Sequence, residues 1–326
     1  NNLIKKTIFK VQNKTNNNFE NSNFNKYLIT FIGLLFLYVF YLLIPLLYDK
    51  TLVKTNIQSK LLNEFKINLS TTGKISYHIL PAPHFIIKGS KILVNNTEKQ
   101  NSIAEIKYLK VFLNQRNFFD QKKMNFKSVV INEANFSLLR SDLILLNRSR
   151  NKKFSNKKIK INNSNIFFKD SLGEVISIVK IDKTILFYDD EKLLNYLNLK
   201  GKIFNIPFIF VSENPTDLTK NKKFSLKSKL IKLNIFNESG LEKNDSFSGE
   251  NIISFLNSII HTKYNIKEKL IIFESDNSKI NNSYINYGGK LSINPFNLDL
   301  NIHLDNQEVS QLFNINPILN EFIKSE

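Results

Sequence analysis

The sequence predicts a mainly β protein with one N-terminal transmembrane helix and few other helices. Residues 27–48 form an uncharged apolar segment of the length that crosses a bilayer. From Gly73 onward, apolar residues alternate with polar residues at the period of two that is typical of strands. Helical patterns are few and do not follow the regular βαβα order of a parallel sheet. These three observations define the predicted fold class.

Composition and charge restrict the classes of function. The 326 residues are 42% hydrophobic and 12% aromatic, which is typical of a folded chain with a sizeable core. The chain has no Cys, so it has neither disulfides nor thiolate chemistry. The net charge is +18, yet only four of the 46 basic residues are Arg. Because Arg is preferred for bidentate phosphate and base contacts, we expect no nucleic-acid partner. A weak attraction to anionic lipid surfaces stays open.

The first element is the predicted membrane anchor. Residues 1–26 are polar and rich in Asn, which predicts a disordered tail. The segment 27–48 reaches roughly 33 Å as a helix, with Tyr27 and Tyr48 at the two ends as interfacial anchors. The apolar segment is longer than the apolar region of a signal peptide and lacks a small-x-small cleavage site, and a soluble helix of this length would have a polar face. The flanking lysines are similar in number on both sides, so the positive-inside rule does not choose an orientation.

The second element is a short amphipathic helix over about 51–66. Val53, Ile57, Leu61 and Phe65 recur at intervals of four and form one apolar stripe. This stripe packs on the β body or lies on the membrane surface, and packing is the more common outcome.

Roughly 13 to 15 alternating runs follow, separated by turns such as Asn95-Asn96, Asp189-Asp190 and Gly288-Gly289. The pattern predicts that Val179, Ile181, Ile185 and Phe187 share one face of a strand. Two further faces are each formed by alternating apolar residues: Phe136 with Leu138, and Phe296 with Leu298, Leu300, Ile302 and Leu304. Additional short helices are predicted at 190–196, 249–261 and 308–323.

Residues 147–158 contain six basic residues and no acid, which predicts a solvated linker between β regions at 49–146 and 159–326. A basic patch that faces lipid headgroups is the alternative interpretation of this stretch.

No constellation of residues nominates a reaction. The four histidines, at positions 78, 84, 261 and 303, form no metal-binding pattern, and His78 and His303 fall on polar strand faces. His84 follows the rigid turn Pro81-Ala82-Pro83. There is no Walker loop, no Gly-x-Gly-x-x-Gly and no Gly-x-Ser-x-Gly motif. We therefore expect no enzyme activity, no cofactor and no metal.

Several segments occur in an order that resembles the AsmA family of bacterial inner-membrane proteins. A helix ending in Leu62-Asn63-Glu64-Phe65 follows the apolar segment, and a strand over 73–80 leads through Pro81-Ala82-Pro83 into a second strand over 85–96. The runs 104–111 and 129–138 resemble the next strand and a closing strand–turn–strand unit of the family. Residues 288–296 resemble its Gly-x-Leu…Pro-Phe step. Residues 147–280 resemble the family only in the spacing of their predicted strands.

The resemblance implies an elongated, curled antiparallel β-sheet that forms an open groove, anchored in the inner membrane with its body in the periplasm. It implies a role in handling or conducting phospholipid between the inner and outer membranes. The implied partners are phospholipid acyl chains, the inner membrane, and outer-membrane or periplasmic assembly proteins. The groove lining would then comprise Phe136, Leu138, Ile185, Phe187, Phe296, Leu298, Leu300, Ile302 and Leu304. Alternation is equally compatible with a closed β core, so a structural or assembly factor of the outer membrane is the alternative function.

Overall fold

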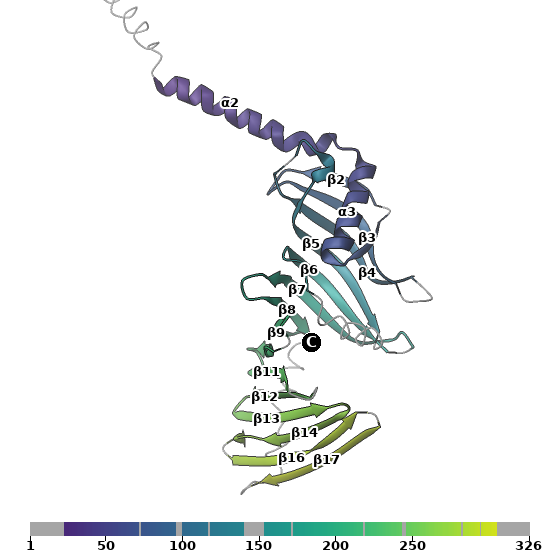
Figure 1. Cartoon of the computed structure of the whole chain (residues 1–326), viewed down its shortest axis with the longest axis vertical. Coiled ribbons are helices and arrows are strands. Elements are labelled where there is room, and N and C mark those ends of the chain that lie inside the picture. Colours follow the sequence, from purple (N-terminus) through teal and green to yellow (C-terminus); the bar gives the residue numbers. More distant parts are fainter. Residues whose placement is uncertain are drawn as a thin grey trace, which may run out of the picture.

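In the computed structural model, the chain forms one long curled sheet whose strands follow one another along the longest axis of the molecule (Figure 1). The structure describes residues 23–71, 73–95, 100–116, 118–139, 153–170, 172–217, 219–242, 246–281, 283–293 and 295–304. Within these ranges the sheet has 17 strands, somewhat more than the sequence predicts. The predicted mainly β fold with an apolar N-terminal helix is confirmed.

The apolar helix α2 (Asn23–Leu43) projects from one end of the sheet and continues into the short 3-10 helix η1 (Ile44–Leu47) (Figure 1). The 23 residues from Asn25 to Leu47 are long and apolar enough to cross a membrane. This segment agrees with the predicted one within two residues, although the helix itself begins four residues earlier, at Asn23. Pro45 falls at the start of η1, where its missing N–H group leaves no helical hydrogen bond unmade. Residues 1–22 of the predicted disordered tail lie outside the described residues.

Three tyrosines fasten the end of this helix to the β body. The Tyr41 and Tyr48 hydroxyls donate hydrogen bonds to the carbonyls of Gln115 and Phe118, and the Tyr41 ring stacks on Phe118 at 5.3 Å between ring centres. The Tyr77 hydroxyl donates to the Leu42 carbonyl at 2.6 Å. Tyr48, predicted as an interfacial anchor, therefore also holds the helix against the body.

The helix α3 (Lys50–Phe65) packs across one face of the sheet. It begins at Asp49, whose carboxylate accepts a hydrogen bond from the Leu52 N–H at 2.8 Å. It ends at Lys66, which adopts the left-handed conformation with φ 58°. All four residues of the predicted stripe are buried, namely Val53, Ile57, Leu61 and Phe65. The stripe packs on the β body, as the sequence favours, and not on a membrane surface.

Two short strands, β1 (Asn68–Thr71) and β2 (Ile75–His78), pair with different parts of β3. The remaining strands run in the following order: β3 (His84–Asn95), β4 (Gln100–Leu113), β5 (Phe126–Leu139), β6 (Lys158–Lys169), β7 (Val175–Asp189), β8 (Leu194–Ile203), β9 (Ile206–Pro215), β10 (Lys222–Ser228), β11 (Leu233–Leu241), β12 (Phe247–Phe255), β13 (Ser258–Lys267), β14 (Leu270–Ser275), β15 (Ser278–Ile280), β16 (Ser283–Ile293) and β17 (Phe296–Leu304). The short 3-10 helix η2 (Gln121–Lys123) precedes β5.

Neighbouring strands are antiparallel with one exception. The strands β5 and β6 are parallel, with Val129 opposite Ile159 and Phe136 opposite Ile166. Parallel strands need a connection that returns along the sheet, and the chain between Leu139 and Lys158 serves as that connection. The predicted basic linker 147–158 falls in this connection, and its residues up to 152 lie outside the described part of the chain.

The two faces of the sheet can be followed strand by strand, because residues directly opposite each other share a face. The face that packs against α3 carries Phe85 and Val111, which are paired in register, and continues through Val129. It then runs through Ile159, Leu186 and Leu197. We call this the α3 face and the other one the opposite face.

Four local predictions are wrong. The stretches 190–196 and 249–261, predicted as helices, form turns and the strands β8, β12 and β13. The predicted turn at Gly288-Gly289 lies inside β16. Residues 129–138, predicted as a strand–turn–strand unit, all belong to the single strand β5. Glu133 within it has a φ of 54°, but there is no turn. The predicted helix 308–323 lies outside the described residues.

A pH effect is expected from His84. Its side chain is buried, stacks on Phe112 at 4.8 Å, and its Nδ1 contacts the Ala82 carbonyl at 2.7 Å. Burial lowers the pKa of His84 below its usual value, so the unfolded chain binds this proton more readily than the folded chain. The stabilising effect is complete above about pH 6.5 and is lost as the pH falls below that value. Thermal unfolding followed by circular dichroism should therefore show a smaller acid-induced decrease in His84→Phe than in the unchanged chain.

The exposed His303 on β17 provides the control, because His303→Asn should leave the acid-induced decrease unchanged. An equal decrease in His84→Phe and the unchanged chain would contradict the assignment.

Candidate functional site

The α3 face is closed near the apolar helix. Side chains from α3 and from β3 to β6 fill the space there, and Ile57, Leu61 and Val111 are fully buried. Figure 1 shows α3 lying across these first strands and no helix across the later ones. This part of the face is a hydrophobic core between α3 and the first strands.

A short segment extends this cover as far as β8. The Phe154 N–H donates to the Asn195 side-chain oxygen at 2.8 Å, and the Tyr188 N–H donates to the Ser155 carbonyl at 2.7 Å. Lys157 forms an ion pair with Glu64 at the end of α3. The end of the predicted linker is therefore ordered, and it marks the limit of the closed part.

From β9 to β17 no described helix or second sheet packs across the α3 face. Large apolar side chains nevertheless continue along it in register from strand to strand. We call this line the apolar row, and its members are Leu199, Phe210, Leu226, Ile235, Ile253 and Ile260. At the far end the face is more exposed, and Phe296, Leu298 and Ile302 expose 76%, 47% and 55% of their surface.

Most of the predicted lining residues lie on this face. Phe136 and Leu138 pair with Ile166 and Phe168 of β6 beside the closed core. The β17 residues pair with the α3-face positions of β16, as in Leu298 opposite Leu291. Leu304 is the last described residue and lies opposite Ile285.

The placement of Ile185 and Phe187 is a correction. Val179 and Ile181 are buried on the α3 face, but the register of β7 shifts between Ile181 and Lys183. A one-residue irregularity moves every later side chain to the other face. Leu186 and Tyr188 therefore occupy the α3 face, whereas Phe187 lies on the opposite face. There the Lys158 Nζ lies 5.2 Å from the centre of the Phe187 ring. No feature of the alternation alone distinguishes this irregularity from a regular strand.

The sequence analysis also missed a line of polar residues on the same face. Asn237, Asn251, Thr262 and Ser275 are opposite one another on β11 to β14. We call them the polar row. On each of β11, β12 and β13 this row is two residues from the apolar row, so the two lines run side by side along the sheet.

A hollow of about 300 Å3 lies where the covered part of the α3 face ends. Its lining combines aromatic, amide and cationic side chains, among them Phe154, Phe224, Asn237 and Lys222. Its volume is at the lower end of the range of small-molecule sites.

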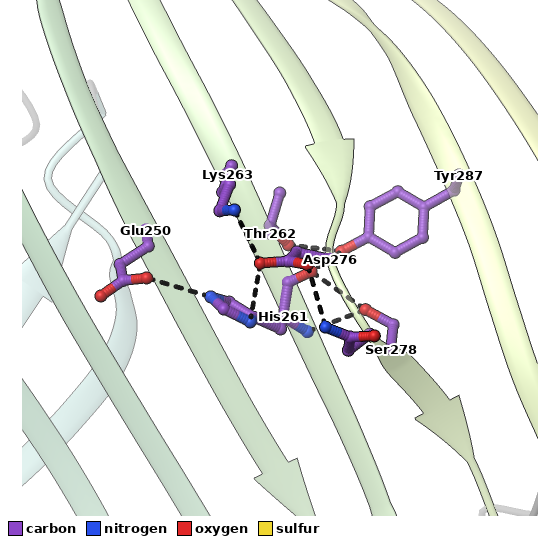
Figure 2. Close-up of polar contacts among 8 residues, drawn as sticks. Glu250, His261, Thr262, Lys263, Asp276, Ser278 and Tyr287 are labelled. Carbon is purple, nitrogen blue, oxygen red and sulfur yellow. Dashed lines mark hydrogen bonds and ion pairs between the residues drawn. The ribbon is translucent and has the colours of Figure 1, made fainter.

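The opposite face carries a network of charged groups around His261 (Figure 2). His261 Nε2 lies 3.1 Å from Glu250, and its Nδ1 lies 3.6 Å from Asp276. Lys263 approaches Asp276 at 2.8 Å, and this hydrogen bond lowers the pKa of the Asp276 carboxyl. The nearby Ser278 hydroxyl donates to the His261 carbonyl and accepts from its N–H. Both imidazole nitrogens face carboxylates and the hydroxyl is held by main chain, so the network fastens β12, β13 and β15 together.

A larger hollow of about 630 Å3 borders this network and is lined by Glu238, Glu250, Glu274 and Lys263 among others. Hydrogen bonds from Asn221 and then Lys223 lower the pKa of Glu238. No three His, Asp or Glu side chains of the described residues are arranged to hold a metal ion.

Comparisons with known proteins add no family: no protein-family model matches the chain, and no curated protein matches it.

Proposed function

We propose that the chain is a non-enzymatic, single-pass protein of the bacterial inner membrane whose β body handles or conducts phospholipid toward the outer membrane. The observation that carries the proposal is the uncovered part of the α3 face, where the apolar row extends past the last covering segment as far as β13 and Phe296 and Leu298 expose apolar surface on the same face of β17. Monomeric soluble proteins rarely expose a contiguous apolar surface of this extent without a partner. Acyl chains would remove that surface from water.

The dimensions of the open surface suit a lipid. Strands lie about 4.8 Å apart, so the path from β8 to β17 extends roughly 40 Å. One leaflet of a bilayer has a hydrocarbon thickness of about 15 Å, half of the bilayer core. The surface is therefore long enough to hold more than one lipid in succession, as transport without a covalent step requires.

The proposed membrane anchor and the proposed location of the body are supported by different observations. The helix Asn25–Leu47 is long and apolar enough to be the anchor. The assignment to the inner membrane and the periplasm rests on the resemblance of residues 49–146 to the AsmA family. Because α3 fills the face nearest the anchor, lipid would join the apolar row beyond α3, at the level of Phe154.

The closed core under α3 favours a second candidate function. If the exposed part of the α3 face is covered by another protein, the chain is a structural or assembly factor for the outer membrane. Its protein partner would then occupy the same apolar row that lipid occupies in the first proposal.

Two adjacent isoleucines on β12 provide a matched test. Ile253 lies on the α3 face opposite Ile260, whereas Ile252 lies on the opposite face beside His261, and both are half-buried. A photo-crosslinking amino acid at position 253 of the full chain in bacterial membranes should give phospholipid adducts by mass spectrometry. The same probe at position 252 should give few or none.

A second pair, Leu298 and Asp299 on β17, repeats the comparison at the exposed end. Protein adducts without lipid adducts at 253 and 298 would favour the assembly factor. Equal lipid adducts at positions 252 and 253 would overturn the facing on which the proposal depends.

A further inference from the structure

The polar row interrupts a surface that is otherwise suited to acyl chains. On β11 the α3 face presents Ile235 and then Asn237, and on β12 it presents Ile253 and then Asn251. On β13 it presents Ile260 and then Thr262. The same change from apolar to polar is repeated at the same level on three neighbouring strands. Such a line of polar residues would destabilise a closed core, because buried amides and hydroxyls need hydrogen-bond partners.

Two tyrosines widen the polar row. Tyr264 reaches across Gly249 to Asn237, whose amide donates to the Tyr264 hydroxyl at 2.8 Å. A Cβ at Gly249 would lie 2.6 Å from that hydroxyl, so this position leaves room for the tyrosine. Figure 2 shows the Tyr287 hydroxyl meeting the Thr262 hydroxyl at the next strands along. Amide and phenol groups are therefore held in place along the row.

Asn251, in the middle of the row, has a buried side-chain oxygen without a hydrogen-bond partner among the described residues. Leaving such a group unpaired is costly, so a hydrogen bond from a ligand or a water that enters from outside the chain would stabilise it.

The charges on the α3 face also favour a polar ligand at this row. On the strands from β8 to β17, Lys222 is the one charged side chain that the described residues place on the α3 face. It is opposite Ser239, two residues beyond Asn237 on the side of the polar row away from the apolar row, and its Nζ lies 6.0 Å from the centre of the Phe247 ring. It also lines the 300 Å3 hollow at the end of the covered part. A single cation among amides and hydroxyls is complementary to a phosphate ester.

We propose that the polar row binds the phosphate-bearing headgroup of a glycerophospholipid, with Lys222 beside it on the side away from the apolar row, while the acyl chains lie on the apolar row. The two rows are two residues apart on each strand, about 7 Å, so one lipid molecule contacts both. From β11 to β13 the lipid thus lies on the sheet in one orientation, with its headgroup on the polar row. This inference rests on the proposed lipid-handling function and adds the site and the orientation to it.

The test compares two lipids that share acyl chains but differ in the headgroup. The full chain with a photo-crosslinking amino acid at position 253, purified in mild detergent and delipidated, is mixed with equal amounts of phosphatidylglycerol and diacylglycerol. Adducts are counted by mass spectrometry. The parent chain should prefer phosphatidylglycerol, and Asn251→Leu should lower that preference on the order of three- to tenfold by removing hydrogen bonds to the headgroup.

Asn251→Leu is expected to fold, because it removes a buried oxygen that has no partner. Asn234→Leu is the matched control, since Asn234 is on the opposite face of β11, opposite Ser254, and should leave the preference unchanged. Lys222→Met should also lower the preference for the anionic lipid.

An unchanged preference in both Asn251→Leu and Lys222→Met, with lipid still captured, would overturn the headgroup site and leave the conduit standing. Capture of neither lipid by the parent chain would overturn the proposed function itself.

Discussion

Leu61→Ala is expected to lower the free energy of unfolding of the N-terminal part of the body by about 2–5 kcal/mol. Leu61 is fully buried between α3 and the sheet, and its neighbours in the core include Val111 and Val129, which are also fully buried. Because the surrounding side chains come from a helix and several strands, they can close the resulting cavity only in part. Urea denaturation of the detergent-solubilised chain, followed by circular dichroism, measures the loss. Hydrogen exchange at β4 and β5 should accelerate in parallel.

The neighbouring residue provides the control for this substitution. Leu62 exposes 48% of its surface on the same helix, so Leu62→Ala removes the same atoms without leaving a cavity. Its effect should stay within about 0.5 kcal/mol. Equal losses for both substitutions would show that α3 does not pack on the sheet as described.

Gly289→Ala is expected to destabilise the last two strands by about 1–3 kcal/mol. Gly289 lies opposite Leu300 on β17, and a Cβ there would be 2.1 Å from the Asp299 carbonyl oxygen and 2.9 Å from the Phe273 ring. The backbone carbonyl has little freedom to move, so the pairing of β16 with β17 must open. Faster hydrogen exchange of residues 296–304 in the full chain is the expected measurement.

Gly288→Ala is the matched control. A Cβ at Gly288 would approach its nearest atom, the Phe273 carbonyl oxygen, at 3.4 Å, which is ordinary contact. The substitution should leave exchange of β17 unchanged or slow it, because Ala restricts the unfolded chain more than Gly does. Identical behaviour of the two variants would contradict the register of β16 against β17.

The two adjacent glycines also illustrate a limit of sequence interpretation. Gly288-Gly289 has the composition of a turn, yet both residues lie inside β16. The reason for Gly at position 289 is the close approach of a neighbouring strand, and that strand is identified only when the sheet is assembled. The apolar spacing of the stretch 249–261 likewise predicts a helix where the structure has strands, because short apolar runs fit both periods.

In the candidate site, too, the sequence predicts the facing of some residues and not of others. The alternation of Phe296, Leu298 and Leu300 was sufficient to place these residues on one face, since β17 is regular. The same reasoning failed for Ile185 and Phe187, because a single irregularity near Asp182 reverses the faces of β7. The sequence does not predict the polar row, because its members lie on separate strands and only the strand register brings them side by side.

The sequence by itself determined the elements whose signal is local. An uncharged apolar segment defines the helix that can cross a membrane, and a stripe at intervals of four defines the buried side of α3. Strict alternation defines strands that have one apolar face. Each of these depends on spacing within a single stretch of chain.

Only the tertiary structure decided where that apolar face is closed and where it is open. The core under α3 and the exposed surface from β9 to β17 are built from the same alternation, so no pattern along the chain separates them. The difference arises because α3 and the segment at Phe154 cover only the first strands, and coverage depends on contacts between residues that are distant in sequence. The position of the polar row beside the apolar row follows from strand register for the same reason.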